Sequence, residues 1–421
     1  MKQKICIIGL GYIGLPTAAM FASNGHKVIG VDTNNEVIEA LEKGEVIIEE
    51  PYLKNMVGQE VVSGNLIASK EPQEADAFIV AVPTPLTKDK KADMSLVKKA
   101  MESIVPYLRK GNMIVLESTS PTGTVKNLII PILKKSGLKI GEELYVGYCP
   151  ERVLPGQILF ELVNNNRIIG GINRKSAEKI KDLYQTFVRG EIYLTDTITA
   201  EMCKIVENTY RDVNIAFANE LSIISENIGV DIWEVIKLCN KHPRVNIHQP
   251  GPGVGGHCLA VDPWFIVEKN PEFARIIKLA RETNDNMPRV IFNKIENILK
   301  NIKGTKKVTI LGITYKANID DTRESPIISL IEILEKHNYK ISVVDPYVKE
   351  FRYKVESIIE AAEASDLLIL AVNHKDFKKL DFDALAKKMR NRIILDTRNY
   401  FNKNTVEIKG FKYYLLGKAN E

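Results

Sequence analysis

The sequence has few cysteines and little net charge. Its 421 residues include five cysteines, an odd number without CxxC spacing, which excludes a disulfide framework and predicts reduced thiols. Lys and Arg outnumber Asp and Glu by 58 to 53, an excess too small and too scattered to predict a nucleic-acid-binding surface. No metal site and no nucleic-acid partner are expected.

Long apolar runs are also missing. None approaches the ~18 residues that a membrane helix requires, and the first residues lead into a strand-like segment, not a signal peptide. We therefore expect a cytoplasmic protein with no membrane partner. The rest of the composition, 45% hydrophobic and 26% charged, is that of an ordinary globular protein long enough for two or three domains.

Residues 4–32 carry the pattern of a dinucleotide-binding βαβ unit. A short apolar run ends in the sequence GLGYIG at positions 9–14, a helical pattern follows, and a second strand over 27–31 ends at Asp32. The glycines permit a tight turn and the close approach of a pyrophosphate, which the N-terminus of the helix faces. A carboxylate at Asp32 accepts hydrogen bonds from ribose hydroxyls and repels a 2′-phosphate, so the sequence predicts NAD in preference to NADP.

Further strands are predicted over 77–82, 113–117 and 145–148, and each ends in a polar or proline-containing segment. In doubly wound sheets the ligand lies at the carboxyl ends of the strands, so these segments are expected to line the cofactor cleft. The residues expected at the cofactor are Gly9, Gly11, Tyr12, Ile13, Gly14, Asp32, Pro83, Thr84 and Thr119.

The middle of the chain has a helical pattern. Apolar residues recur at helical spacing from about 195 to 229, and Asp231 begins a second helix predicted over 232–241. Lys204 and Asn208 lie four residues apart, on one face of the long helix. An amphipathic helix of this kind is more often core or dimer interface than a catalytic element.

The last third of the chain repeats the strand pattern of the first, with a glycine after one strand and an aspartate after the next. Residues 306–311 lead into Gly312, and a strand over 340–344 ends at Asp345 as the second strand ends at Asp32. The loop after Gly312 lacks the later glycines, which favours a nucleotide other than a second NAD, with a purely structural duplicate as the alternative. We predict an α/β fold of two Rossmann-like doubly wound domains joined by a central helical domain with a long helix. The expected bounds of the NAD-binding, central and C-terminal domains are 1–194, 195–302 and 303–421.

Residues 251–262, with the sequence GPGVGGHCLAVD, surround Cys258 with glycines and place Asp262 one helical turn later. Four glycines and a proline exclude a regular helix or strand, so the cysteine is expected on a loop that a ligand can approach closely. Two interpretations of the loop alone stay open. It is either a turn with a buried thiol or a nucleophile in a backbone-lined pocket.

Several separated motifs together resemble those of the UDP-glucose/GDP-mannose dehydrogenase family over essentially the whole chain. They are GLGYIG at 9–14, VPTP at 82–85, ST at 118–119, PE at 150–151, EMCK at 201–204 with Asn208, GGHC at 255–258 with Asp262, and YK at 315–316 through DTRES at 321–325. Residues 242–246, 249–254 and 261–265 are most similar to the UDP-N-acetyl-D-mannosamine dehydrogenases of that family, and PERVLPG at 150–156 departs from the pattern of the UDP-glucose enzymes.

The resemblance implies two successive NAD-dependent oxidations at C6 of a UDP-N-acetylhexosamine, from alcohol to carboxylate. Cys258 is then the nucleophile that carries a thiohemiacetal and a thioester. The further catalytic residues that the resemblance implies are Lys204 and Asn208 at the oxyanion, Thr119 at the water, and Asp262 or Glu151 as the base in thioester hydrolysis.

The same resemblance implies the ligand contacts. Arg323 faces the cofactor, and Arg244 reaches in from a neighbouring subunit of a homodimer, or a higher homo-oligomer, formed through the central helix. His257 either lowers the pKa of the thiol or shapes the sugar pocket. The expected substrate-binding residues are Glu151, Arg152, Val153, Lys204, Asn208, His242, Arg244, Gly253, Gly255, His257, Tyr315, Lys316 and Arg398.

Three functions stay open at this point. They are a two-step dehydrogenase of a UDP-N-acetylhexosamine, a simple two-electron dehydrogenase on the same scaffold, and a non-catalytic NAD-dependent regulator or binding protein. The pairing of Cys258 with Lys204 argues against the last two. Mannosamine and glucosamine substrates differ at C2 alone, and one hydrogen bond discriminates them by about 1–3 kcal/mol, so the sequence leaves both possible.

Overall fold

The computed structural model describes residues 2–419. The chain divides into two compact units, Met1–Glu207 with Trp264–Lys269, and Asn208–Pro263 with Asn270–Glu421. The 32-residue helix α8 (Thr197–Ile228) begins in the first unit and ends in the second. Among the residues described, no helix combines the length and the apolar character that crossing a bilayer requires.

The first unit is built on an eight-stranded sheet with the order β3-β2-β1-β4-β5-β6-β7-β8. Strands β1 to β6 are parallel, whereas β7 runs antiparallel to β6 and parallel to β8. Strands β3, β7 and β8 were not predicted from the sequence. The bounds are β1 (Lys4–Ile8), β2 (Lys27–Val31), β3 (Leu66–Ser69), β4 (Ala77–Val80), β5 (Met113–Leu116), β6 (Tyr145–Tyr148), β7 (Arg167–Gly171) and β8 (Ile192–Asp196).

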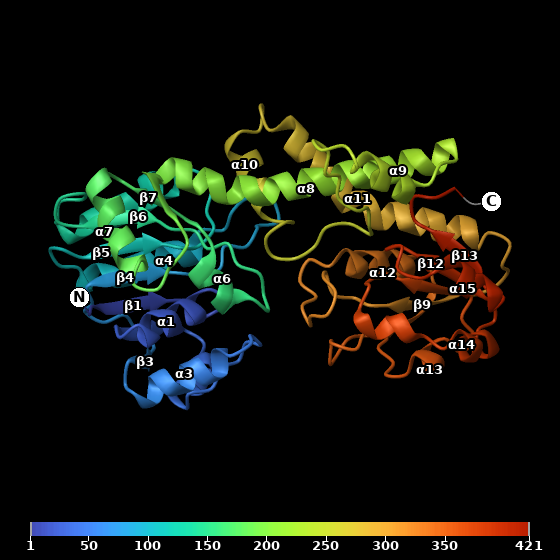
Figure 1. The fold of residues 1–421 in the computed structure, drawn as a ribbon, viewed down its shortest axis with the longest axis horizontal. Coiled ribbons are helices and arrows are strands. Elements are labelled where there is room, and N and C mark those ends of the chain that lie inside the picture. The colour runs from blue at the N-terminus through green and yellow to red at the C-terminus, as the bar shows by residue number, and fades with distance from the viewer. Residues whose placement is uncertain (1, 420–421) are drawn as a thin grey trace. The chain divides into compact units, whose positions relative to one another are not determined.

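Helices cover both faces of this sheet (Figure 1). Because side chains alternate along a strand, Ile5 and Ile7 of β1 pack into one core and Cys6 and Ile8 into the other. The strand order reverses between β1 and β4, which is where doubly wound sheets form their ligand crevice. The helices are α1 (Gly14–Ser23), α2 (Asn35–Glu42), α3 (Leu53–Val62), α6 (Ile158–Asn164) and α7 (Arg174–Tyr184) on the first core, and α4 (Ser95–Ile104) and α5 (Ile130–Leu133) on the second.

The second unit contains a five-stranded parallel sheet with the order β10-β9-β11-β12-β13. This order repeats β2-β1-β4-β5-β6 of the first sheet. Helices α11 and α12 pack on one face, and three short helices pack on the other (Figure 1). The bounds are β9 (Lys307–Leu311), β10 (Lys340–Val344), β11 (Leu367–Leu370), β12 (Ile393–Asp396), β13 (Lys412–Leu415), α12 (Pro326–Lys336), α13 (Ile358–Ala361), α14 (Phe382–Lys388) and α15 (Lys403–Ile408).

The helical segment between the sheets contains α8, α9 (Ile232–Cys239), α10 (Asp262–Lys269) and α11 (Arg275–Ile298). Asp231 caps α9, since its side chain accepts a hydrogen bond from Trp233 N at 3.0 Å. The helix predicted over 195–229 is observed two residues shorter at its start, and α11 was not predicted. The predicted fold class, two Rossmann-like sheets joined by a helical region with a long helix, is confirmed.

Candidate active site

The loop between β1 and α1 leaves space for a phosphate. Gly9 has a φ of +94°, and a Cβ at Gly14 would lie 1.8 Å from the Gly9 carbonyl oxygen, so only glycine lets α1 start this close to β1. Gly11 is exposed, and beyond its chain neighbours no described atom lies within 4 Å of the position of a Cβ there. The open space precedes the N-terminus of α1 and fits a pyrophosphate.

Asp32 directly follows β2 and accepts a hydrogen bond from the same loop. Its Oδ2 accepts a hydrogen bond from Leu10 N at 2.9 Å, and its Oδ1 accepts one from Asn34 N at 2.9 Å. The side chain stays partly exposed, and each carboxylate oxygen keeps acceptor capacity for a ribose hydroxyl. These residues fit NAD, which would be held by the glycine loop and by Asp32.

The segments that follow β4 and β5 meet at the same edge of the sheet. Thr84 Oγ1 donates a hydrogen bond to the Thr119 carbonyl oxygen at 2.7 Å. Thr84 is buried, Thr119 is half-buried and Pro83 is exposed. The structure therefore brings these predicted cofactor residues to the carboxyl ends of neighbouring strands, as the sequence pattern indicates.

Asp32→Ala combined with Thr33→Arg is expected to shift the cofactor preference toward NADP. The change removes the charge that repels a 2′-phosphate and adds a cation that attracts one. The ratio of kcat/KM for NADP to that for NAD should rise by about 10-fold or more. Asp32→Ala alone is the control, and an unchanged ratio in the double variant would show that Asp32 does not face the ribose.

Cys258 is exposed in a turn directly before α10. Its carbonyl oxygen accepts hydrogen bonds from Val261 N at 3.1 Å and from Asp262 N at 2.8 Å, which fixes the acid one helical turn after the thiol. By contrast, burial raises the pKa of Cys6 to about 11 and that of Cys149 to about 12, which makes both thiols inert. Of the two interpretations of the loop, the buried thiol is therefore excluded.

The glycines before Cys258 let the loop lie against the segment 315–326. Gly256 has a φ of +85°, and a Cβ there would lie 2.7 Å from the ring of Tyr315. Its N–H donates to the Arg323 carbonyl oxygen at 3.1 Å, and a Cβ at Gly255 would lie 2.4 Å from the Glu324 carbonyl oxygen. Because Gly255 and Gly256 have no side chains, the ring of Tyr315, a predicted substrate residue, lies against Gly256, which precedes Cys258 by two residues.

Asn208 connects the long helix to Asp262. Its Nδ2 donates a hydrogen bond to Asp262 Oδ2 at 2.5 Å, and Arg211 donates to its Oδ1. Both bonded side chains, Asn208 and Asp262, are buried. The two bonds fix the orientation of the amide, with its nitrogen toward the acid. Lys204 lies one turn earlier on α8 and is 9% exposed.

A buried polar network, which was not predicted, supports one end of the Cys258 loop. Arg281 of α11 lies 2.5 Å from Asp212 of α8, and the two side chains are 1% and 0% exposed. Arg281 also hydrogen-bonds with Asp285, and its Nη1 donates to the Leu259 carbonyl oxygen at 3.5 Å. Burial raises the pKa of Asp212 above its usual range, although Arg281 opposes this.

The same network reaches the other end of the loop through two asparagines. Asn284 Nδ2 donates to Asp212 Oδ1 at 2.8 Å, and its Oδ1 accepts from Asn219 Nδ2 at 2.8 Å. Asn219 Oδ1 in turn accepts from Gly251 N at 2.8 Å. The sequence carries a signal for this network, because polar residues at 208, 212 and 219 recur at helical spacing within the long helix.

Glu151 lies in the first unit, just after β6, and is paired. Its Oε2 is 2.5 Å from Nη2 of Arg167, and its Oε1 accepts from Arg152 N at 2.8 Å. The two charged side chains are 5% and 3% exposed, and the guanidinium lies over the ring of Tyr184. Oε2 is thus held in an ion pair and Oε1 in a hydrogen bond to the backbone, so the carboxylate of Glu151 is already engaged within the chain.

His257 is partly buried beside charged residues of the segment 321–324. Burial lowers the pKa of His257, and Arg323 lowers it further, while Asp321 and Glu324 oppose the change. The lowered pKa favours the neutral imidazole. A neutral ring does not stabilise a thiolate by charge, which favours the role of shaping the sugar pocket.

The other predicted residues of the second unit lie near the same loop or on the surface. A Cβ at Gly251 would lie 2.5 Å from Nη1 of Arg398, so this arginine packs on the start of the loop. Arg323 pairs with Asp321 at 2.7 Å. His242, Arg244 and Lys316 are exposed.

Within residues 2–419 no group of three or more His, Cys, Asp or Glu side chains is placed to hold a metal ion.

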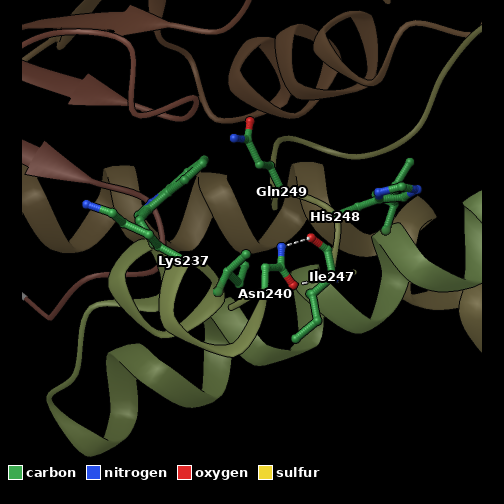
Figure 2. A pocket seen from close by; sticks show the side chains of 8 residues that line it. Lys237, Asn240, Ile247, His248 and Gln249 are labelled. Atoms are coloured by element: carbon green, nitrogen blue, oxygen red, sulfur yellow. Dashed lines mark hydrogen bonds between the residues drawn. The ribbon is translucent and has the colours of Figure 1, made fainter. Parts of the chain in front are cut away.

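A hollow of about 590 Å³ lies in the helical segment of the second unit, and Cys258 does not line it (Figure 2). Asn240 Nδ2 donates to the Ile247 carbonyl oxygen at 2.9 Å, and Asn240 Oδ1 accepts from Ile247 N at 2.8 Å. These bonds hold the chain that leads into the Cys258 loop. The lining residues are Ile215, Trp233, Ile236, Lys237, Asn240, Ile247, His248 and Gln249.

Comparisons with known proteins agree with this geometry. Residues 3–188, 198–286 and 309–403 match, in that order, the NAD binding domain, the central domain and the UDP binding domain of the UDP-glucose/GDP-mannose dehydrogenase family. The glycine loop, Asp32 and the exposed thiol define an NAD-dependent oxidoreductase. More particularly, the chain belongs to the UDP-glucose/GDP-mannose dehydrogenase family.

Individual relatives cover nearly the whole chain. A UDP-N-acetyl-D-mannosamine dehydrogenase of Methanocaldococcus jannaschii is 50% identical over 99% of this chain and 96% of its own length. An NDP-N-acetyl-D-galactosaminuronic acid dehydrogenase of Ralstonia nicotianae is 45% identical over 95% of this chain and 96% of its own. The solved UDP-D-ManNAc dehydrogenase of Pyrococcus horikoshii is 38% identical, with a TM-score of 0.94 over 99% of this chain and 100% of that one.

Proposed function

We propose that this protein oxidises C6 of UDP-N-acetyl-D-mannosamine from the alcohol to the carboxylate in two successive two-electron steps. The observation that carries the proposal is the 50% identity, over 99% of the chain, to the Methanocaldococcus jannaschii enzyme. Two NAD⁺ molecules, bound one after the other, would each accept one hydride and so supply the electron acceptor for the two steps. We assign NAD binding to residues 1–194, the thiol loop and the subunit contact to 195–302, and UDP-sugar binding to 303–421.

Cys258 is proposed to make the second oxidation possible. An aldehyde has to become a tetrahedral adduct before it loses another pair of electrons, and addition of the thiolate to the carbonyl carbon provides that adduct. Oxidation of the thiohemiacetal leaves a thioester on Sγ, and water then releases the carboxylate and restores the thiol. The exposure of Cys258 on a loop tied to the start of α10 supports this role.

Lys204 and Asn208 are proposed to stabilise the negative charge that develops on the substrate oxygen. Lys204 is 9% exposed, and its cation is therefore little screened by water. Asn208 uses Nδ2 to hold Asp262, and that nitrogen carries a second N–H for the oxyanion. Thr119 is proposed to order the hydrolytic water.

Asp262→Asn is expected to slow hydrolysis of the thioester by about 10²-fold. The amide keeps an acceptor for Asn208 but no longer takes a proton from water. Glu151→Gln should slow hydrolysis less, because Arg167 and a backbone N–H already bind both oxygens of Glu151. Mass spectrometry of the quenched enzyme measures the covalent adduct on Cys258. Accumulation of the adduct in the Glu151 variant, but not in the Asp262 variant, would reverse the assignment of the base.

Turnover with purified UDP-sugars tests the proposed function. Two NADH and one uronate per UDP-N-acetyl-D-mannosamine support it. One NADH with free aldehyde would select a simple two-electron dehydrogenase, and no NADH would select a regulator. The glucosamine substrate is the alternative that the sequence left open, and the Ralstonia nicotianae relative adds the galactosamine substrate as a second candidate. The kcat/KM values of the three sugars decide among them.

We also propose that two copies of the chain associate through α8. Apolar side chains lie exposed at successive turns of one face of this helix, and a shallow groove runs along its first turns. A second copy is the fitting occupant, because a two-fold helix pair covers the same stripe on both chains. Exposed Arg244 is then available to a neighbour. The stripe consists of Ile198, Met202, Val206, Tyr210, Phe217, Ile224 and Ile228.

Phe217→Glu is expected to dissociate the dimer. The side chain is 52% exposed on the single chain, so a charge there is tolerated by the monomer but would be buried in the helix pair. Light scattering at micromolar concentration should show about half the wild-type mass. Lys179→Glu is the matched control, because the side chain of Lys179 is exposed on α7. A wild-type protein that is already monomeric would overturn the proposed contact.

A further inference from the structure

The two Rossmann-like sheets repeat one hydrogen-bond arrangement at the turn after their first strand. In the first sheet Gly9 N donates to the Val31 carbonyl oxygen at 2.8 Å, and Leu10 N donates to Asp32 Oδ2 at 2.9 Å. In the second sheet Gly312 N donates to the Val344 carbonyl oxygen at 2.8 Å, and Ile313 N donates to Asp345 Oδ2 at 2.8 Å. Asp345 is therefore the structural counterpart of Asp32.

The two aspartates differ in what covers them. Asp32 is partly exposed, whereas Asp345 is 1% exposed beneath the ring of His374. His374 Nε2 lies 3.1 Å from Asp345 Oδ2, and the ring of Tyr347 stacks on His374 with the centroids 4.9 Å apart. His374 follows β11 at the position where Thr84 follows β4. A side chain of the protein thus takes the place beside Asp345 that a ribose would take beside Asp32.

The hydrogen bonds define which ring nitrogen of His374 carries the proton. Asn318 N donates to Nδ1 at 2.9 Å, so Nδ1 is an acceptor and the proton lies on Nε2. Burial would raise the pKa of Asp345, but the hydrogen bonds from His374, Ile313 and Tyr347 outweigh it and lower that pKa. A charged Asp345 accepts from Nε2–H, in agreement with the tautomer.

The same ring holds the loop that contains Tyr315 and Lys316. Thr314 Oγ1 lies 3.3 Å from His374 Nε2 and donates to the Lys316 carbonyl oxygen at 2.8 Å. Asn318 has a positive φ of 62°, a conformation that asparagine tolerates better than most residues. The loop is therefore attached to His374 before and after the two predicted nucleotide contacts.

We propose that His374 is a positioning residue. It occupies the place beside Asp345 where a ribose would otherwise bind, and it holds residues 314–318 in the shape that binds UDP. This rests on the proposed function, in which the C-terminal domain binds the UDP moiety. The arrangement also argues against a second NAD on this sheet, because the carboxylate that would select a ribose is already bonded and buried.

The test compares four variants of the full chain by titration calorimetry with UDP and, on the same samples, with NAD⁺. His374→Leu keeps about the volume of the side chain but removes its hydrogen bonds, and Thr314→Val removes the hydroxyl that connects His374 to the Lys316 carbonyl oxygen. His374→Asn restores an acceptor near Nδ1. His337→Leu is the matched control, because this histidine is exposed directly after α12 in the same domain. Steady-state kinetics with the UDP-sugar give KM and kcat for each protein.

We expect His374→Leu to raise the Kd for UDP by about 10-fold or more, and Thr314→Val to raise it severalfold. KM for the UDP-sugar should rise more than kcat falls, the Kd for NAD⁺ should stay within about twofold, and His374→Asn should recover part of the loss. A Kd for UDP within about twofold of wild type in both His374→Leu and Thr314→Val overturns the inference. A wild-type protein that binds no UDP overturns the proposed function instead, and the inference with it.

Discussion

Cys258→Ala is expected to abolish formation of the acid while both nucleotides still bind. Without the thiol the aldehyde cannot become the adduct that the second oxidation needs, so the kcat for uronate formation should fall by about 10³-fold or more. The measurements are NADH and uronate per UDP-sugar under single-turnover conditions, together with the Kd of NAD⁺ and of UDP. At most one NADH per sugar should form.

Cys239→Ala is the matched control for this experiment. Cys239 lies at the end of α9 and is exposed like Cys258, so its removal tests the general effect of losing a surface thiol. It should leave turnover unchanged. If the Cys258 variant still released uronate at the wild-type rate, the thioester mechanism would be wrong, although NAD-dependent oxidation of the alcohol could stand.

Arg281→Met should produce the largest loss of stability among the substitutions considered. The cation lies 2.5 Å from Asp212, and both side chains are almost completely buried. Removing one partner leaves a buried carboxylate without its counter-charge, which costs about 3–5 kcal/mol. Thermal and denaturant unfolding measure the change, and the transition of the second unit should move to lower temperature.

The double variant Arg281→Met/Asp212→Asn separates charge from packing. It removes the uncompensated carboxylate but keeps a polar group for Asn284, so it should recover part of the loss. If the double variant were no more stable than Arg281→Met, the buried charge would not be the cause. A similar double variant at the exposed pair of Lys278 and Glu282 is the control, because exposed pairs contribute about 0–1 kcal/mol.

The same variants report on the Cys258 loop. Arg281 bonds to the Leu259 carbonyl oxygen, and Asn219 holds the Gly251 N–H at the other end. We therefore expect Arg281→Met to change the rate at which iodoacetamide alkylates Cys258, at a temperature where the variant is still folded. The alkylation of Cys239 provides the internal reference. An unchanged ratio of the two rates would mean that the network stabilises the unit without positioning the thiol.

Much of the fold and part of the site follow from local sequence. The glycine loop and Asp32 lie within one βαβ unit, and their roles depend on backbone shape over about thirty residues. The strand ends that carry Thr84 and Thr119 are predictable for the same reason, since parallel strands bring their carboxyl ends to one edge. Strands β3, β7, β8 and β13 escaped prediction because their apolar runs are short.

What the sequence by itself determined is the pair of Rossmann-like units with a long helix between them in the chain, the cofactor loop and the isolated thiol among glycines. Only the tertiary structure decided which distant polar groups meet. Asp212 and Arg281 are 69 residues apart, and Asp345 and His374 are 29 apart. A local pattern shows that a helix face or a strand end is polar, but its partner depends on how the elements pack, because a buried polar group is satisfied by whichever neighbour the fold brings within hydrogen-bond distance.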